Sequence, residues 1–195
     1  MAGPPSDREF DFHPGMDMRW EVARSTEETS GEVFESTNWL DPGMPGPPVH
    51  VHPNAEESFE VIEGSLEVFK DGEWATFGPG EAATVPAGAP HTLRNGDEAS
   101  KIVTRLRPAG RSEAFFRHLH SLIREGKLKR LPPKEPRSAI YAAMLFNNYP
   151  DVTRVTGPLS GASGRWPFSG EGLGSGSRSL MPLHGVATIF PRRPS

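Results

Sequence analysis

The strongest constraint on the fold is a succession of short strand-like runs, separated by turn residues, from about residue 17 to residue 107. The pairs Asp71-Gly72 and Asn95-Gly96 mark two of the turns, because both pairs tolerate the positive φ angles of tight hairpins. No internal repeat divides the region. This pattern predicts one mainly β domain of the sandwich or barrel type. The expected strands are Met16 to Val22, Glu32 to Leu40, Val49 to His52, Glu57 to Glu63, Leu66 to Phe69, Trp74 to Phe77, Ala82 to Val85, His91 to Arg94 and Lys101 to Leu106.

After Pro108 the apolar residues recur at helical spacing. A first helix is expected from Ser112 to Glu125, with Ser112 as its N-cap and Gly126 as its C-cap. A second, shorter helix is expected over residues 138–148. The apolar positions of the two helices are Phe115, Phe116, Leu119, Leu122 and Ile123 in the first, and Ile140, Met144 and Leu145 in the second.

The helices have two interpretations. Their apolar stripes favour a role in covering an open end or edge of the β domain. Alternatively, their basic side chains touch a membrane surface. The basic residues concerned are Arg117, Arg124, Lys127, Lys129 and Arg130.

The composition changes again near Gly157, where Gly and Ser become frequent and periodic apolar residues become rare. Such a segment is expected to be a disordered tail. The chain is therefore expected to consist of a β-barrel with its N-terminal strands over residues 1–110, a helical appendage over 111–150 and a tail over 151–195.

The chain has no cysteine, which excludes disulfides, thiolate zinc sites and cysteine nucleophiles. Any metal must therefore be held by imidazole and carboxylate groups. The net charge of -4 and the lack of a basic stripe argue against a nucleic-acid partner. The N-terminus has no signal-peptide pattern, and no window has the apolar length to cross a bilayer. We therefore expect a cytoplasmic protein without stable membrane association.

Three residues of the segment HVHPNAEESFEVIEG are candidates for metal binding. Residues two apart on a strand share a face, so His50 and His52 present both imidazoles to one side. On the next strand Glu57 shares the face of Phe59 and Val61, which reads as an interior. A carboxylate in apolar company is costly unless it is paired or bound to a metal. Its neighbour Glu56 falls on the opposite, solvated face and is the weaker candidate.

A third imidazole is expected from the segment GEAATVPAGAPHTLRN. His91 begins a strand in which Leu93 shares its face, so the imidazole points inward beside an apolar neighbour. Pro86 and Gly88 form the turn that precedes it.

The two segments resemble the two signature motifs of the cupin superfamily, in which a strand pair supplies two histidines and a glutamate and a later strand supplies a third histidine. The second motif is matched in full by Gly80, Pro86, Gly88, His91 and Asn95. The first is matched from His50 to Gly64, with Met44 at the position of the opening glycine. The second motif would arise by chance on the order of 10⁻⁴ times in a chain of this composition. The resemblance covers about residues 30 to 108.

This resemblance implies a double-stranded β-helix, or jelly-roll, barrel with the C-terminal helices outside it. It implies one divalent metal on His50, His52, Glu57 and His91. Within the superfamily the chain is similar to small quercetin-dioxygenase-like proteins, which implies that Glu57 also serves as a catalytic base toward a substrate hydroxyl. A homodimer is implied as well.

The ligand set suits a divalent transition metal, namely Fe, Mn, Ni, Cu or Zn. An apolar substrate pocket is expected from Phe59, Val61, Val85 and Leu93. Such a lining favours a small aromatic or enol-type substrate over a sugar phosphate, and a dioxygenase is the leading interpretation. Two alternatives stay open at this point: a metal-dependent isomerase, epimerase or lyase, and a non-catalytic cupin that binds a small molecule.

Overall fold

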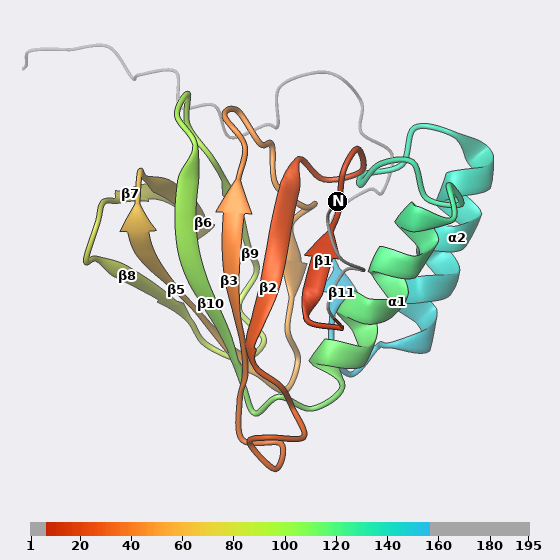
Figure 1. Cartoon of the computed structure of the whole chain (residues 1–195), viewed down its shortest axis with the longest axis horizontal. Coiled ribbons are helices and arrows are strands. Elements are labelled where there is room, and N and C mark those ends of the chain that lie inside the picture. The colour runs from red at the N-terminus through yellow and green to blue at the C-terminus, as the bar shows by residue number, and fades with distance from the viewer. Residues whose placement is uncertain (1–6, 157–195) are drawn as a thin grey trace, which may run out of the picture. The chain divides into compact units, whose positions relative to one another are not determined.

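The computed structural model describes residues 7–156, which contain eleven strands and two helices (Figure 1). The strands form two antiparallel sheets. The six-stranded sheet has the order β1-β2-β3-β10-β5-β8, and the five-stranded sheet has the order β11-β4-β9-β6-β7. The elements are β1 (Glu9–Asp11), β2 (Met18–Arg24), β3 (Phe34–Leu40), β4 (His50–Val51), β5 (Glu56–Glu63), β6 (Leu66–Lys70), β7 (Glu73–Phe77), β8 (Ala82–Val85), β9 (His91–Arg94), β10 (Ser100–Arg107), α1 (Ser112–Arg124), α2 (Pro136–Asn148) and β11 (Arg154–Val155).

The mainly β, jelly-roll fold expected from the sequence is confirmed. Each expected strand is present, with ends shifted by at most two residues. Alternation decides which side chains face the core: along β5, Glu57, Phe59 and Val61 are buried, whereas Glu56 is exposed. The strands β1 and β11 were not predicted, because runs of three and two residues are too short to display a period.

Helix α1 buries the predicted apolar stripe against the β1–β3 side of the six-stranded sheet. The ring of Phe116 lies 4.4 Å from that of Trp20 and 6.0 Å from that of Phe34, measured between centroids. The N-cap prediction was wrong by one residue: Arg111 occupies the cap, and Ser112 is the first helical residue. The C-cap prediction was also wrong by one residue: Glu125 is the C-cap, and Gly126 follows it with φ of 67° and its N–H donating to the Ile123 carbonyl.

The apolar face predicted for α2 is partly wrong. Leu145 is buried, but Ile140 is 61% exposed and Met144 is 55% exposed. The packed face instead consists of Ser138, Ala142 and Leu145, which recur at helical spacing. The small side chains of this face leave Ile140 and Met144 on the opposite side of the helix.

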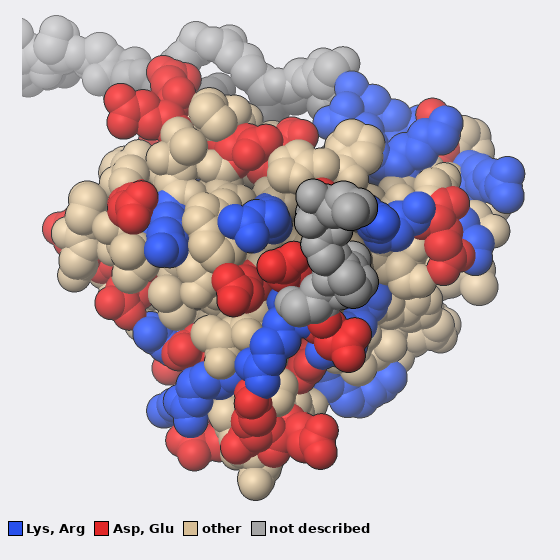
Figure 2. All heavy atoms as spheres, viewed as in Figure 1, with Lys and Arg blue, Asp and Glu red and all other residues tan. Residues whose placement is uncertain are grey.

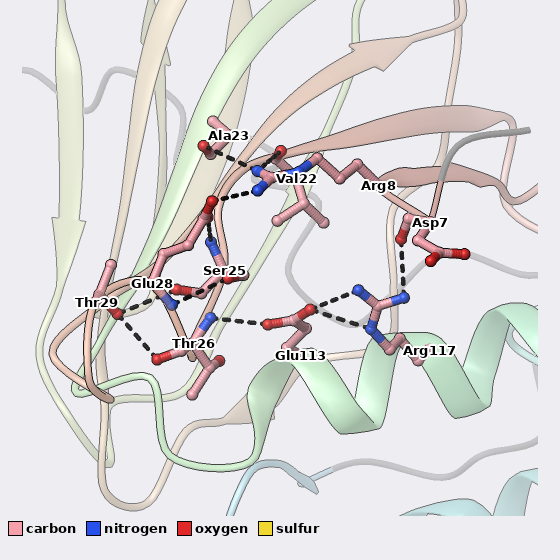
Figure 3. Close-up of polar contacts among 10 residues, drawn as sticks. All are labelled: Asp7, Arg8, Val22, Ala23, Ser25, Thr26, Glu28, Thr29, Glu113 and Arg117. Atoms are coloured by element: carbon pink, nitrogen blue, oxygen red, sulfur yellow. Dashed lines mark hydrogen bonds and ion pairs between the residues drawn. The ribbon is translucent and has the colours of Figure 1, made fainter.

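Polar contacts also hold α1 in place (Figure 3). The Glu113 carboxylate accepts a hydrogen bond from the backbone N–H of Thr26 at 2.8 Å, in the connection between β2 and β3. It also accepts one from Arg117 at 2.7 Å. Arg117 in turn donates to the Asp7 carbonyl at 2.8 Å. These contacts fix the helix relative to the N-terminal strands, and so fix what it presents to the interior.

The C-terminal part of the described chain is folded beyond the boundary predicted at residue 151. Strand β11 pairs antiparallel with β4, with Val155 opposite His50. The predicted tail over residues 157–195 lies outside the described residues. Within residues 7–156, neither helix combines the length and the apolarity needed to cross a membrane.

Candidate metal centre

Four side chains from the two sheets converge between them. His50 lies on β4 directly opposite His91 on β9, and His52 follows the end of β4. Glu57 comes from β5 in the other sheet. One nitrogen of each histidine and one carboxylate oxygen of Glu57 all lie within 4.8 Å of one another. His52, Glu57 and His91 are buried and His50 is half-buried, so the structure brings together the four residues that the sequence suggested.

Backbone carbonyls fix the tautomers of all three imidazoles. The Nδ1 atoms of His50, His52 and His91 lie 2.9, 2.7 and 2.9 Å from the carbonyl oxygens of Pro48, Val152 and Ala89. A carbonyl only accepts hydrogen bonds, so each Nδ1 must carry the proton. In a neutral ring the Nε2 lone pair is then free, which is how histidine ligands are oriented in metal sites.

The Nε2 atoms of two of these rings face the Glu57 carboxylate. Glu57 Oε2 lies 2.8 Å from Nε2 of His91 and 3.2 Å from Nε2 of His52. The second contact lacks hydrogen-bond geometry, so His52 Nε2 is a buried polar atom without a partner within residues 7–156. A proton or a metal cation between nitrogen and oxygen satisfies both atoms. The donor set and this buried unpaired nitrogen therefore fit a divalent transition metal.

The electrostatics of the cluster favour a charged carboxylate at Glu57 and a neutral imidazole at His50. Burial opposes charge on Glu57, yet the charges and hydrogen bonds of His52 and His91 hold the pKa of its carboxyl far below the usual value. Burial and the neighbouring rings of His91 and His52 lower the pKa of His50 to about 3. Burial also opposes charge on His52, but the Glu57 carboxylate outweighs it and raises the pKa of that imidazole. A carboxylate that stays ionised beside a ring that stays neutral is the state that ligates a cation.

A cavity of about 70 Å³ adjoins the cluster, with His50, His52 and Glu57 in its wall. Its other walls are mostly apolar, and Asn38, Thr104 and Thr153 are the polar exceptions. Of the pocket residues expected from the sequence, Phe59 and Leu93 line this cavity. Val61 and Val85 are buried in the core but do not belong to its lining.

Sequence reasoning missed the wall opposite the cluster. This wall comes from β2, α1, α2 and the adjoining loops, through Met18, Trp20, Phe115, Phe116, Leu119, Leu131 and Phe146. The helical stripe of α1 indicated that its apolar residues are buried. It carried no signal for the surface they face, because that depends on how the helix docks onto the sheet.

The segment around β11 was also missed, although it orients a candidate ligand. The Val152 carbonyl that accepts from His52 lies 100 residues further along the chain. The motif glycine Gly88, with φ of 79°, donates its N–H to the His52 carbonyl at 2.8 Å. His52 is thus held from both its ring and its backbone, and only the second contact belongs to a recognisable motif.

The motif residue Asn95 serves the fold rather than the cluster. Its side-chain amide donates to the carbonyls of Asp41 and Glu98 at 2.8 and 2.7 Å, and its oxygen accepts from Ser100. Two arginines on strands of the two sheets, Arg94 on β9 and Arg105 on β10, are engaged away from the cluster. Arg94 pairs with Glu67, and Arg105 pairs with Glu35 and Glu60, so neither lines the cavity.

Comparison with known proteins finds similarity over part of the chain. A family model described as "Cupin domain" matches residues 39–104. Quercetin 2,3-dioxygenase of Bacillus subtilis (strain 168) is 37% identical over 97 residues, which cover 49% of this chain and 27% of that protein. Polyketide synthase CurC of Streptomyces cyaneus is 40% identical over 60 residues, which cover 30% of this chain and 39% of that protein. The match thus spans well under half the length of either curated relative.

Among solved structures, KdgF from Halomonas sp. is similar with 21% identity and a TM-score of 0.44, over 51% of this chain and 86% of that chain. TT1209 from Thermus thermophilus is similar with 32% identity and a TM-score of 0.38, over 40% of this chain and 74% of that chain.

Proposed function

This chain carries a cupin domain over residues 39–104 and belongs to the cupin superfamily, and from that premise we propose that it is a metal-dependent dioxygenase of a small aromatic or enol-type substrate. The observation that carries the proposal is the convergence of three imidazoles and one buried carboxylate on the wall of an apolar cavity. Neither a cluster without a cavity nor a cavity without a cluster would support substrate chemistry at a metal.

Each residue of the cluster has a defined part. His50, His52 and His91 would hold one divalent metal through Nε2, with the proton of each ring kept on Nδ1 by its carbonyl. Glu57 would complete the set through its carboxylate. A bound metal with open positions would supply Lewis-acid and redox chemistry toward an oxygen-bearing substrate. The candidates remain Fe, Mn, Ni, Cu and Zn, since affinity order alone does not choose among them.

Glu57 is also the candidate base. Its carboxylate lines the cavity and keeps its charge at neutral pH, because His52 and His91 hold its pKa low. It faces a phenol or enol hydroxyl that enters the cavity, but its low pKa also makes it a weak base, so taking up that proton would require a metal-bound and thereby acidified hydroxyl. The resulting oxyanion is the form of such a substrate that binds a metal most strongly, so proton transfer to Glu57 prepares the substrate for reaction.

The walls of the cavity support an aromatic or enol-type substrate. Trp20, Phe59, Phe115 and Phe116 line the space, and the polar residues outside the cluster are few. The chemistry of such walls suits a flat, largely apolar molecule with a small number of oxygens. Because a cavity of about 70 Å³ is smaller than the roughly 150 Å³ that takes up benzene, side chains of the wall must move for such a molecule to enter. The name of the quercetin 2,3-dioxygenase relative supports the same substrate class.

The proposal is tested by elemental analysis of the chain purified without added metal, followed by oxygen-electrode assays with quercetin, simpler polyphenols and 1,3-diketones. We expect about one metal ion per chain and oxygen uptake with at least one of these substrates. Turnover without oxygen consumption would assign the site to an isomerase or lyase. Tight binding without any product would assign a non-catalytic binding role, and both results would contradict the dioxygenase.

A neighbouring pair of glutamates provides the matched control. Glu57→Gln removes the carboxylate that lines the cavity, whereas Glu56→Gln removes the same charge from the exposed face of β5. We expect oxygen uptake to be lost in the first variant and retained in the second. Equal activity of the two variants would contradict the role of Glu57.

Two properties of the whole protein remain predictions. A homodimer is expected from the resemblance, and light scattering at several concentrations tests it. A cytoplasmic location is expected from the sequence, and fractionation of the source cells tests it.

A further inference from the structure

Two polar residues lie on the sheet side of the cavity beside the cluster. Asn38 on β3 and Thr104 on β10 line the same cavity as His50, His52 and Glu57. Their side chains are almost fully buried, with 2% and 3% of their surface exposed. Burial of an amide and a hydroxyl costs free energy that apolar side chains at these positions would not cost. Packing of the sheet alone would therefore favour apolar residues here.

The two side chains are hydrogen-bonded to each other. The Asn38 amide group lies 2.8 Å from Thr104 Oγ1. The amide nitrogen faces the other way, where it donates to Ser36 Oγ at 2.8 Å and to the Thr37 carbonyl at 3.2 Å, because a carbonyl only accepts. The Asn38 oxygen therefore accepts from the Thr104 hydroxyl. This hydrogen bond uses one lone pair of the amide oxygen and none of Thr104 Oγ1, so the pair can accept further hydrogen bonds.

The register of the sheet sets the separation between this pair and the carboxylate of the cluster. Thr104 lies directly opposite Phe59 on β5, and Glu57 precedes Phe59 by two residues on the same face. Thr104 and Glu57 are thus diagonal neighbours, which in an antiparallel pair lie about 7–8 Å apart. Asn38 is one strand further from Glu57. A single aromatic ring with oxygens at opposite ends can span such a separation.

The strands that carry the pair are held on both edges. β10 pairs with β3 on one side and with β5 on the other, and β3 pairs on its second edge with β2. The opposite wall of the cavity consists of side chains from helices and loops, among them the flexible thioether of Met16. When a molecule enters, we expect that wall to yield while Asn38 and Thr104 keep their positions.

The polar groups of the cavity differ in charge from those of the surface. Figure 2 shows acidic and basic side chains mixed over the surface in view, and on the outer face of β10 Arg105 pairs with Glu35 and Glu60. The buried residues of the same strand are all uncharged, namely Ser100, Ile102, Thr104 and Leu106. A neutral pair of acceptors favours a neutral donor such as a hydroxyl. It disfavours a carboxylate, whose oxygens would face the oxygens of the pair.

We propose that Asn38 and Thr104 form a second recognition point, which accepts a hydrogen bond from a substrate hydroxyl at the end of the molecule opposite its metal-bound oxygens. This inference rests on the proposed function and narrows it to a substrate that carries a further hydroxyl away from the metal. The cluster then holds one end of the substrate and the pair holds the other. The pair thereby selects among ring substrates that present the same oxygens to the metal.

The test uses the full chain loaded with zinc, which does not change its oxidation state, in the absence of oxygen so that the probes stay reduced. Three probes present the same catechol oxygens to the metal and differ in one ring substituent. This substituent is a hydroxyl in 1,2,4-benzenetriol, an ether oxygen in 4-methoxycatechol and a methyl group in 4-methylcatechol. We expect the triol to bind about tenfold more tightly than 4-methylcatechol in a calorimetric titration, which corresponds to one hydrogen bond. 4-Methoxycatechol can accept but not donate, and should have no such advantage.

These comparisons need no variant and so do not depend on whether a variant folds. Equal affinities of the triol and 4-methylcatechol would overturn the inference and leave the metal site intact. An advantage of 4-methoxycatechol equal to that of the triol would overturn it as well. If none of the probes bound to the zinc-loaded chain, the proposed function would itself fail, and the inference with it.

Variants assign the effect to the pair. Asn38→Leu together with Thr104→Val replaces both partners by apolar side chains of similar shape, which avoids leaving one polar group unpaired. We expect the ratio of the triol and 4-methylcatechol affinities to fall from about tenfold to about one. Thr37→Val removes a hydroxyl from the half-buried outer face of β3 and is expected to keep the full ratio. A full ratio in the folded double variant, or a lost ratio in Thr37→Val, would overturn the assignment.

Discussion

The two walls of the cavity beside the cluster differ in how the chain builds them. One wall carries His50, His52 and Glu57, which lie within eight positions of one another in the sequence, on β4, just after it and on β5. The other wall brings together Trp20 and Phe146, which are separated by more than a hundred residues. The first wall is defined by residue chemistry at strand spacing, and the second by the docking of helices onto a sheet. Substitutions in the first should therefore change chemistry, and substitutions in the second should change stability and substrate fit.

The largest effect of any substitution is expected at the cluster, on metal content. His91→Ala removes one imidazole and leaves Glu57 without its closest partner, so metal content should fall close to zero. Elemental analysis after gel filtration measures it. His118→Ala, on α1 and outside the cluster, is the control and should retain the full metal content. Unchanged metal stoichiometry in His91→Ala would contradict the claim that the cluster, and not the apolar wall, determines metal binding.

The next largest effect is expected in the apolar wall. Phe116→Ala should lower the free energy of unfolding by about 3–5 kcal/mol, because it empties a buried ring site between Trp20 and Phe34. Metal content should stay that of the parent chain once the variant is folded. Denaturant titration measures the first quantity, and Met144→Ala, at an exposed position of α2, should change it by less than about 0.5 kcal/mol. Loss of metal from folded Phe116→Ala would show that the walls are not independent.

The third largest effect is expected from removal of β11, which pairs with β4 and contributes Val155 to the cavity lining. A chain that ends at Asn148 lacks the Val152 carbonyl that orients His52, whereas a chain that ends at Thr156 keeps it. Loss of such an orienting contact typically weakens metal binding by about 10–100-fold. Competition with a metallochromic chelator compares the two truncated chains. Equal affinities would mean that the strands alone orient His52.

The smallest effect concerns His13, whose ring bridges Asp11 at 2.6 Å and Asp41 at 3.0 Å. Burial opposes its charge, but the two carboxylates outweigh this and raise the pKa of His13. The imidazolium therefore stabilises the native state below the unfolded pKa, and this stabilisation is lost as pH rises through the folded pKa. Because all three groups are well exposed, His13→Gln should cost less than about 1 kcal/mol at pH 5.5 and nothing at pH 9.

Acidification is expected to act in opposite directions on the metal affinity of the cluster and on the stability contributed by His13. Metal binding requires neutral imidazoles, so metal affinity should fall on acidification, while the contribution of His13 to stability should grow. Parallel measurements of metal content and unfolding free energy at several pH values compare the two. A metal content in His13→Gln below that of the parent chain would contradict the separation.

Much of the fold was predictable because alternation is a local property. Along β5 the residues two apart share a face, which assigned Glu57 to the interior and Glu56 to solvent. The same reasoning failed for α2, where Ile140 and Met144 are apolar but exposed. Helical spacing predicts that a stripe exists, but a helix with both small and large residues can pack through either face. The choice depends on the neighbour, in this case α1.

By itself the sequence determined which segments of the motifs form strands, the residue types of the candidate metal ligands and the side of each strand on which they stand. These follow from spacing of two residues and from turns that begin and end within a few positions. Only the tertiary structure decided that α1 and α2 contribute to the cavity wall and that Val152 orients His52. Such contacts join residues far apart in the chain, and their energy depends on packing geometry that no local pattern records.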